Sequence, residues 1–263
     1  MKIPLKSREE IALLYAGGQK LSQILVDLVK TTQVGVRLKE IETKAGQQIE
    51  KAGGKPAFAE VPGYRWATCL NINEGIVHGV PNDYQIQSGD IVSIDLGMRY
   101  RGWITDTSTT FQVPADKPQA VLLKTGEKVN AAEIKAFLAT GKKALIRAIN
   151  QARPGKRIGH ISAAIQRVIE GAGYTTLKNL TGHGVGRALH EPPSIPCFLR
   201  EEVTATPMIK PGMVLAVEVI YTMGSHETET DKDGWTIRSR DGKIAAVFEK
   251  TIAVNSDGPL VCT

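Results

Sequence analysis

Two aspartates lie in neighbouring strand-like segments, where their carboxylates could bind a metal ion. In IVSIDL, period-two alternation places Asp95 inside an otherwise apolar strand, and Asp106 follows in GWITDTSTT. A hairpin centred between Tyr100 and Arg101 would place the two carboxylates directly opposite each other, where like charges repel. A buried carboxylate must be paired or bound to metal. Because Arg99 and Arg101 fall at the presumed turn, away from the carboxylates, we expect a divalent cation between them.

The second half of the chain offers the same arrangement with two glutamates. Glu218 lies in VLAVEVI and Glu249 in AAVFEKT, each flanked by apolar strand residues. Two Asp-Gly dipeptides, at 233–234 and 241–242, are hairpin signals between them, so the register stays open. We expect only that the two strands are near neighbours.

A short internal repeat links the two acidic strands. Residues 89–95, GDIVSID, align without gaps to residues 212–218, GMVLAVE, and each segment has a turn glycine, strand residues and an acid six positions after the glycine. A His-Gly-Val triplet precedes each of them, at His78 and His183. These matches predict a duplicated half that supplies a histidine and an acidic strand. The expected boundaries are 1–263 for one catalytic domain and roughly 1–115 and 116–263 for its halves.

Three histidines, His78, His183 and His190, stand beside glycine or proline in loop-like segments that border the acidic strands. The Gly-x-Gly-x-Gly around His183 lacks the preceding strand and following helix of a dinucleotide-binding loop. Four carboxylates with one or more histidines form a mostly oxygen-donor set. Such a set can hold two first-row divalent cations about 3.5–4 Å apart with a bridging water. The implied chemistry is metal-assisted hydrolysis.

The composition is that of an ordinary globular protein. The chain has 263 residues, 33 Lys and Arg against 27 Asp and Glu, and 42% hydrophobic residues, which excludes wholesale disorder. Three scattered cysteines without a CxxC pair argue against a disulfide framework and against structural zinc. No apolar run approaches about 18 residues, so we expect a soluble cytoplasmic protein without a membrane segment. The basic residues are spread along the chain, which favours a solvated surface over a nucleic-acid site.

The elements that must position these residues alternate between helices and sheet. Helical spacing over 8–30 and 36–54 predicts two amphipathic helices, and β-branched runs over 67–113 predict a sheet. Helical patterns return over 119–151 and 155–174, and a second strand-rich region follows. The predicted fold class is therefore α/β (α+β), in which two halves share one site.

Seven segments of the chain form an ordered set of motifs: NINEGIVHGVP, GDIVSIDLG, GWITDTSTTF, TGHGVGRALHEPP, KPGMVLAVE, KDGWTIRS and FEKTIAV. Their order is that of type I methionine aminopeptidases, which the chain resembles over essentially its whole length. This resemblance implies the pita-bread fold, with two pseudo-symmetric halves and a central curved, mainly antiparallel sheet flanked by helices. It also implies an aminopeptidase that uses a metal-bridged water to remove the initiator methionine from nascent proteins and peptides with a small second residue.

The resemblance also implies roles for individual residues. Five residues would be ligands of two divalent ions (Co, Mn, Fe or Zn): Asp95, Asp106, His183, Glu218 and Glu249. Of these, Asp106 and Glu249 would bridge both ions. His78 and His190 would contact the substrate peptide and the developing oxyanion, and Glu218 would also shuttle a proton. Four residues fall where the family builds its methionine pocket, the last of them the weakest match: Tyr64, Cys69, Trp235 and Phe58.

The sequence departs from the family pattern at several places. Val219 replaces the proline that usually follows the glutamate, and Val61 and Leu189 stand where aromatic residues are more usual. An apparent insertion over 114–134 could add a helical turn or a contact surface. We therefore expect the pocket to differ in detail while the metal ligands are kept.

Two alternative functions stay open. Prolidase and aminopeptidase P-like enzymes share the fold but usually carry a large domain before the catalytic one, whereas the first ligand here is already Asp95. A non-catalytic pita-bread protein could bind RNA or ribosomes through its basic surface, but all five ligand positions are filled. The expected partners are nascent polypeptides and peptides with N-terminal methionine, with a transient ribosome contact and no membrane, and the expected state is a monomer.

Overall fold

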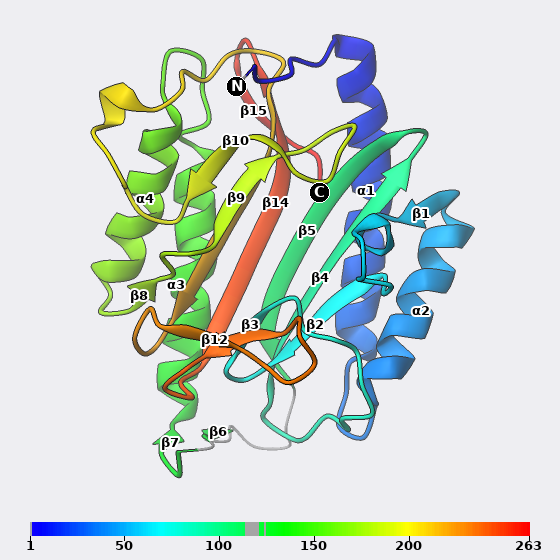
Figure 1. Cartoon of the computed structure of the whole chain (residues 1–263), viewed down its shortest axis with the longest axis vertical. Coiled ribbons are helices and arrows are strands. Elements are labelled where there is room, and N and C mark those ends of the chain that lie inside the picture. Colours follow the sequence, from blue (N-terminus) through cyan, green and yellow to red (C-terminus); the bar gives the residue numbers. More distant parts are fainter. Residues whose placement is uncertain (1, 114–120, 124) are drawn as a thin grey trace.

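One mainly antiparallel sheet runs through the centre of the protein (Figure 1). The structure is a computed structural model, which describes residues 2–113, 121–123 and 125–263. Seven strands follow the order β1-β4-β5-β14-β11-β9-β10, while β2, β8 and β15 pair at its sides. The strands of this sheet are β1 (Gly54–Pro56), β2 (Thr68–Ile72), β4 (Ile91–Tyr100), β5 (Trp103–Gln112), β8 (Thr175–Thr176), β9 (Thr181–Gly184), β10 (Glu191–Pro196), β11 (Val214–Thr222), β14 (Ala245–Asn255) and β15 (Gly258–Val261).

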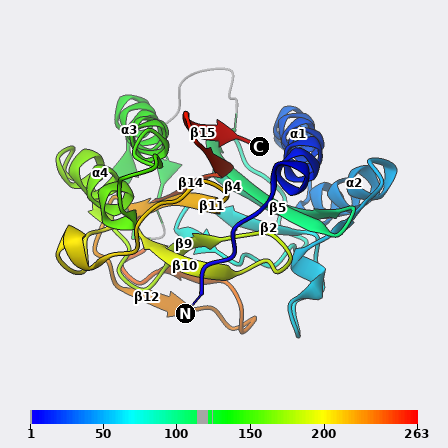
Figure 2. The same cartoon turned by 90° about the horizontal axis from the view of Figure 1, so that it is seen from above.

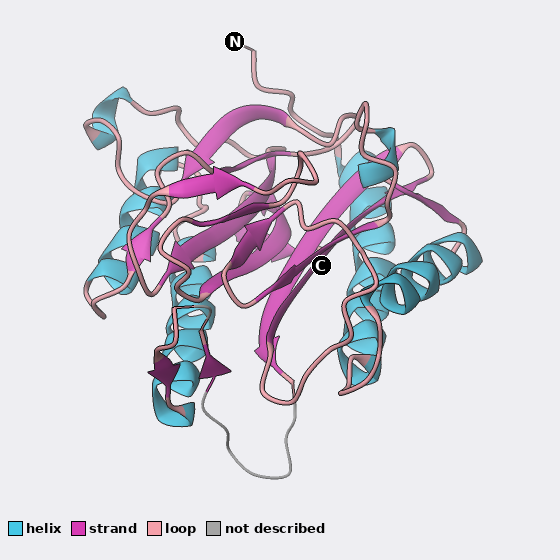
Figure 3. Cartoon of the chain, turned by 60° about the horizontal axis from the view of Figure 1, so that its bottom comes forward, coloured by secondary structure: helices cyan, strands magenta, loops and turns pink. Residues whose placement is uncertain are grey.

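Two pairs of helices flank the strands, one pair for each half of the chain (Figure 2). Figure 3 shows the pairs on either side of the strands. The helices are α1 (Arg8–Thr31), α2 (Leu38–Lys51), α3 (Ala131–Ile149) and α4 (Ile158–Glu170). Capping boxes fix the starts of α1 and α3, at Ser7 with Glu10 and at Asn130 with Glu133. The expected fold class is confirmed.

The two halves join at the middle of the sheet. The β4–β5 hairpin belongs to the first half and the β11–β14 pair to the second, and β5 pairs with β14. The helices α1 and α2 bury apolar faces against the first half, while α3 and α4 pack against the second. The residues at the centre of the sheet are thus contributed by both halves of the chain.

The register of the β4–β5 hairpin differs from the symmetric one expected from the sequence. Tyr100 pairs with Trp103 across a two-residue turn formed by Arg101 and Gly102. Both turn residues have positive φ, 48° and 86°, as type I′ hairpins require. The expectation that the two aspartates are directly opposite was therefore wrong, because the turn is centred one residue further along the chain.

A smaller sheet and a short strand pair complete the fold. The smaller sheet has the order β12 (Thr228–Thr230), β13 (Ile237–Ser239), β3 (Gly75–Val77). In the apparent insertion, residues 114–120 and 124 lie outside the described residues. Its described part forms β6 (Val121–Leu122), β7 (Lys128–Val129) and the first turn of α3, from Ala131. No helix in the described part of the chain is long and apolar enough to cross a membrane.

Candidate active site

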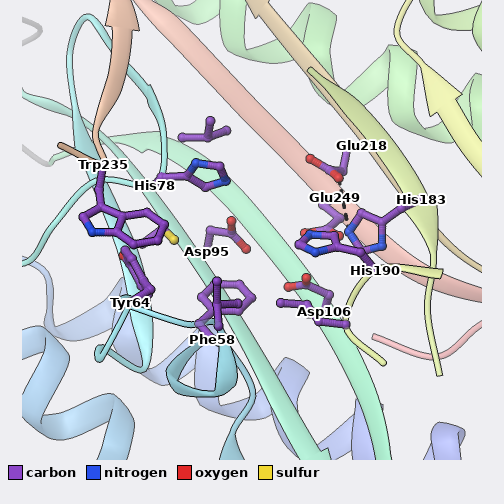
Figure 4. A pocket seen from close by; sticks show the side chains of 14 residues that line it. Phe58, Tyr64, His78, Asp95, Asp106, His183, His190, Glu218, Trp235 and Glu249 are labelled. Carbon is purple, nitrogen blue, oxygen red and sulfur yellow. Dashed lines mark ion pairs between the residues drawn. The ribbon is translucent and has the colours of Figure 1, made fainter. Parts of the chain in front are cut away.

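One pocket brings together every candidate residue that the sequence identified (Figure 4). All eleven candidates, from the acidic strands, the histidine segments and the aromatic positions, are among the 14 residues that line it. The remaining three are Val61, Val77 and Leu189. Of these three, Val77 is the one that the sequence motifs did not identify. Its position directly before His78 in the sequence could have indicated that it lines the pocket.

Four carboxylates of the pocket lie on four adjacent strands. Asp95 on β4 is opposite Ser108 on β5, Ser108 is opposite Glu249 on β14, and Glu249 is opposite Glu218 on β11. Directly opposed residues face the same side of a sheet, so these side chains form one row across it. Asp106 on β5 lies two residues from Ser108, which places it on the same face. The prediction that the strands of Glu218 and Glu249 are near neighbours is confirmed.

His183 closes this row at its far end. It lies on β9, opposite Ala216, and its Nε2 is 3.5 Å from Oε1 of Glu218. Its Nδ1 lies 2.8 Å from the carbonyl oxygen of Gly184, and a hydrogen bond donated there leaves Nε2 as the ligand atom. The prediction that His183 lies in a loop-like segment was therefore wrong, since the residue is part of a strand. The glycines let strands pack closely, since a Cβ at Gly182 would lie 2.5 Å from the carbonyl oxygen of Ala216.

The other two histidines approach the carboxylates from loops. His190 lies in a bend just before β10, with its ring centroid 4.5 Å from that of His183. His78 follows β3 and adopts a positive φ of 58°. Burial lowers the pKa of both residues, and it lowers the pKa of His183 to about 4. All three imidazoles are therefore neutral near pH 7, which suits one of them to metal ligation and all of them to hydrogen bonding.

Three of the four carboxylates each have a buried oxygen that no hydrogen bond in the described residues satisfies. Asp106 is 4% exposed and Glu249 2%. Among the described residues, Oδ1 of Asp95, Oδ1 of Asp106 and Oε1 of Glu249 are buried oxygens without a hydrogen-bond partner. Burial raises the pKa of Asp95 to about 7 and holds the pKa of Asp106, Glu218 and Glu249 well above the usual range.

These unsatisfied oxygens meet the requirements of a divalent metal centre. Asp106, His183 and Glu249 each offer a ligand atom, and the three atoms lie within 4.8 Å of one another. Carboxylate oxygens and an imidazole nitrogen suit first-row divalent ions. A cation would also offset the burial that opposes ionisation of these acids. The donor set present in the fold therefore fits the metals expected from the sequence.

The other end of the pocket is apolar (Figure 4). The rings of Tyr64 and Trp235 meet edge to face with centroids 5.1 Å apart, and Phe58 and Cys69 belong to the same apolar cluster. The Tyr64 hydroxyl donates to the carbonyl oxygen of Thr68 at 2.8 Å, so the ring is held and its polar atom is satisfied. Burial raises the pKa of the Cys69 thiol, which keeps it neutral. This end can accept an apolar side chain.

Comparisons with known proteins relate this chain to metallopeptidases. Residues 13–256 match the model of metallopeptidase family M24. The methionine aminopeptidase of Aquifex aeolicus is 35% identical, over 100% of this chain and 99% of that protein. The solved methionine aminopeptidase of Thermotoga maritima superposes with a TM-score of 0.89 at 32% identity, over 100% of this chain and 99% of that one.

A prolidase structure shares the fold at lower similarity. The prolidase of Pyrococcus furiosus superposes with a TM-score of 0.74 at 22% identity, over 98% of this chain but only 65% of its own. The full-length similarities confirm the relationship to methionine aminopeptidases that the motifs indicated. With its matched residues and its carboxylate-rich pocket, the chain belongs to metallopeptidase family M24.

Proposed function

We propose that this enzyme is a metal-dependent methionine aminopeptidase, which removes N-terminal methionine from nascent proteins and peptides with a small second residue. The observation that carries the proposal is one pocket with a carboxylate row at one end and an apolar cluster at the other. An unbranched thioether side chain suits an apolar recess lined by aromatic rings. The full-length similarity to methionine aminopeptidases supports the same activity.

The residues proposed to hold two divalent ions are the four carboxylates and one histidine: Asp95, Asp106, His183, Glu218 and Glu249. Asp106 and Glu249 are the proposed bridging ligands, and their burial and unpartnered oxygens support this assignment. Ions held there would supply an acidified water as nucleophile and polarise the substrate carbonyl. The ligand set fits Co, Mn, Fe and Zn alike.

Three side chains of the pocket would act on the substrate. His78 and His190 line the pocket with lowered pKa values and are neutral, so each can donate a hydrogen bond to a peptide carbonyl or to the oxyanion that forms from it. Glu218 has a raised pKa, which suits it to accept a proton and return it to the leaving amine. The aromatic wall of Tyr64 and Trp235 would exclude water from the methionine side chain.

Cleavage of a defined peptide set by the metal-loaded protein tests this function. We expect release of methionine from Met-Ala-Ser, and none from its N-acetylated form or from proline-containing dipeptides. Metal content is measured on the same sample. Cleavage of the proline-containing peptides would favour the prolidase-like alternative, and bound metal without turnover of any peptide would favour the non-catalytic one. The ribosome contact and the monomeric state stay predictions from the sequence.

A further inference from the structure

The segment before α1 reaches the loop that carries His190. The side chain of Lys6 is only 3% exposed, and its Nζ lies 2.6 Å from Oε2 of Glu191, whose side chain is 8% exposed. The backbone N–H of Lys6 donates to the carbonyl oxygen of Gly212 at 2.7 Å, which fixes the segment beside the start of β11. Lysine and glutamate are rarely buried so completely unless they are paired.

Glu191 uses its other oxygen to close the loop over residues 186–191. Oε1 accepts hydrogen bonds from the backbone N–H groups of Arg187, at 2.7 Å, and Ala188, at 3.1 Å. The loop also packs directly on the ion pair, because a Cβ at Gly186 would lie 2.6 Å from Cε of Lys6 and 3.0 Å from Oε1 of Glu191. One carboxylate therefore connects Lys6 to the backbone that leads to His190.

We propose that Lys6 is a positioning residue for His190. Lys6 neutralises Glu191 and so holds the loop that places the His190 imidazole in the pocket. The proposal rests on the proposed function, in which His190 contacts the substrate. Removing one partner of a buried ion pair leaves an unpaired charge, which is strongly destabilising. Without Lys6 the Glu191 carboxylate would turn toward water, release the two loop amides and carry the adjacent His190 away from His183.

The first test separates positioning from general stability. We expect Lys6→Met to lower kcat about tenfold or more, since a displacement of about 1 Å can cost this much, while bound metal and KM for Met-Ala-Ser stay near wild type. Lys6→Arg should keep most of the activity. Lys2→Met, an exposed lysine of the same segment, is the matched control and should match wild type.

A double-mutant cycle then asks whether Lys6 acts through His190. In a His190→Ala background, Lys6→Met should cause no further loss of kcat, because the group that it positions is already gone. Equal losses in both backgrounds would overturn the proposal. A loss of bound metal in Lys6→Met would do the same, since the lysine would then support the metal ligands instead.

A readout without turnover keeps this inference separate from the proposed function. Amide hydrogen exchange over residues 186–191 should be faster in Lys6→Met than in wild type, and slower again in Lys6→Met/Glu191→Gln, where no buried charge is left unpaired. Unchanged exchange in Lys6→Met would overturn the proposal even in an active enzyme. If wild type fails to release methionine while the exchange differs as expected, the proposed function fails and the loop contact stands.

Discussion

Glu218 and Glu249 lie directly opposite each other on β11 and β14, with both side chains facing the pocket. Cross-strand neighbours have Cβ atoms about 4.5–5.5 Å apart, and two ionised carboxylates at this separation repel. Burial opposes ionisation and raises the pKa of both residues, and neighbouring carboxylates add to the effect. The pair is therefore unfavourable on its own and becomes favourable once a cation lies between the carboxylates.

Replacing one member of this pair should affect stability and metal binding in opposite directions. Glu249→Gln removes about 1 kcal/mol of repulsion, so the Tm of the metal-free protein at pH 8 should rise by about 2–4 °C. The same change should weaken metal binding and abolish activity, as should Asp106→Asn. Thermal melts with and without Mn²⁺ measure both effects. Wild-type metal affinity in Glu249→Gln would contradict its bridging role.

The metal-free protein should lose stability as the pH rises. The pKa of Asp95 is raised from 3.8 to about 7 by burial, so the folded state binds more protons than the unfolded state between these values. The stabilising contribution is complete below about pH 4 and is lost as the pH rises through about 7. Urea unfolding at pH 5 and pH 8 measures this loss. Saturating metal should reduce this loss of stability. Equal stability of the metal-free protein at both pH values would contradict the burial argument.

The sequence predicted the acidic strands because alternation within one segment is a local property. Asp95 and Glu218 stand out as charges inside apolar runs, and both lie in strands that line the pocket. The expected hairpin register was wrong by two residues, with Asp95 opposite Ser108 and not Asp106, because turn geometry, not sequence symmetry, sets it. The resemblance to a family, more than any pattern of spacing, identified the aromatic positions of the pocket.

Other features depend on contacts between distant residues, which no local pattern encodes. The pairing of Glu249 with Ser108 joins the two halves and aligns the carboxylates in one row. The ion pair of Lys6 and Glu191 spans 185 residues. His183 looked like a loop residue because the glycines beside it are usually turn signals, whereas here they permit close strand packing.

The two neighbouring histidines should differ when each is removed. His183→Ala takes away an imidazole whose Nε2 faces Glu218, so it should lower metal affinity and activity together. His190→Ala should keep the metal and lose kcat by about 10²–10³, the usual effect of removing one hydrogen bond to an oxyanion. Metal titration by calorimetry and steady-state kinetics measure the two effects. Loss of metal in His190→Ala would reverse the assignment.

A glycine beneath the apolar end of the pocket should set the position of an aromatic wall. A Cβ at Gly97 would lie 2.9 Å from Cε1 of Phe58 and 3.2 Å from Cβ of Ala57. Gly97→Ala should therefore push Phe58 into the pocket and raise KM for Met-Ala-Ser several-fold, with metal binding unchanged. The double variant Gly97→Ala/Phe58→Leu should lower KM again, because the smaller leucine leaves room for the new Cβ at position 97. No change in KM for Gly97→Ala would show that Phe58 does not bound the substrate site.

Arg99 connects the two loops on either side of the pocket. Its Nε donates to Glu60 at 2.6 Å, in the connection whose short 3₁₀ helix (Phe58–Glu60) carries Phe58. Its Nη1 donates to the carbonyl oxygen of Arg187 at 3.1 Å, in the loop that carries His190. The guanidinium is partly exposed, so its ion pair with Glu60 should add little to global stability. Its effect should fall on the relative position of the two pocket walls.

Arg99→Ala should therefore raise KM for Met-Ala-Ser several-fold while Tm changes by no more than about 2 °C. Arg99→Lys should not restore KM, because an ammonium group cannot reproduce the planar set of donors that reaches both loops. The matched control is Lys55→Ala, an exposed residue opposite Arg99 on β1, which should keep the wild-type KM. Michaelis–Menten kinetics and thermal melts of the three variants decide the matter. A fall in Tm without a change in KM would mean that Arg99 stabilises the β4–β5 hairpin and not the pocket.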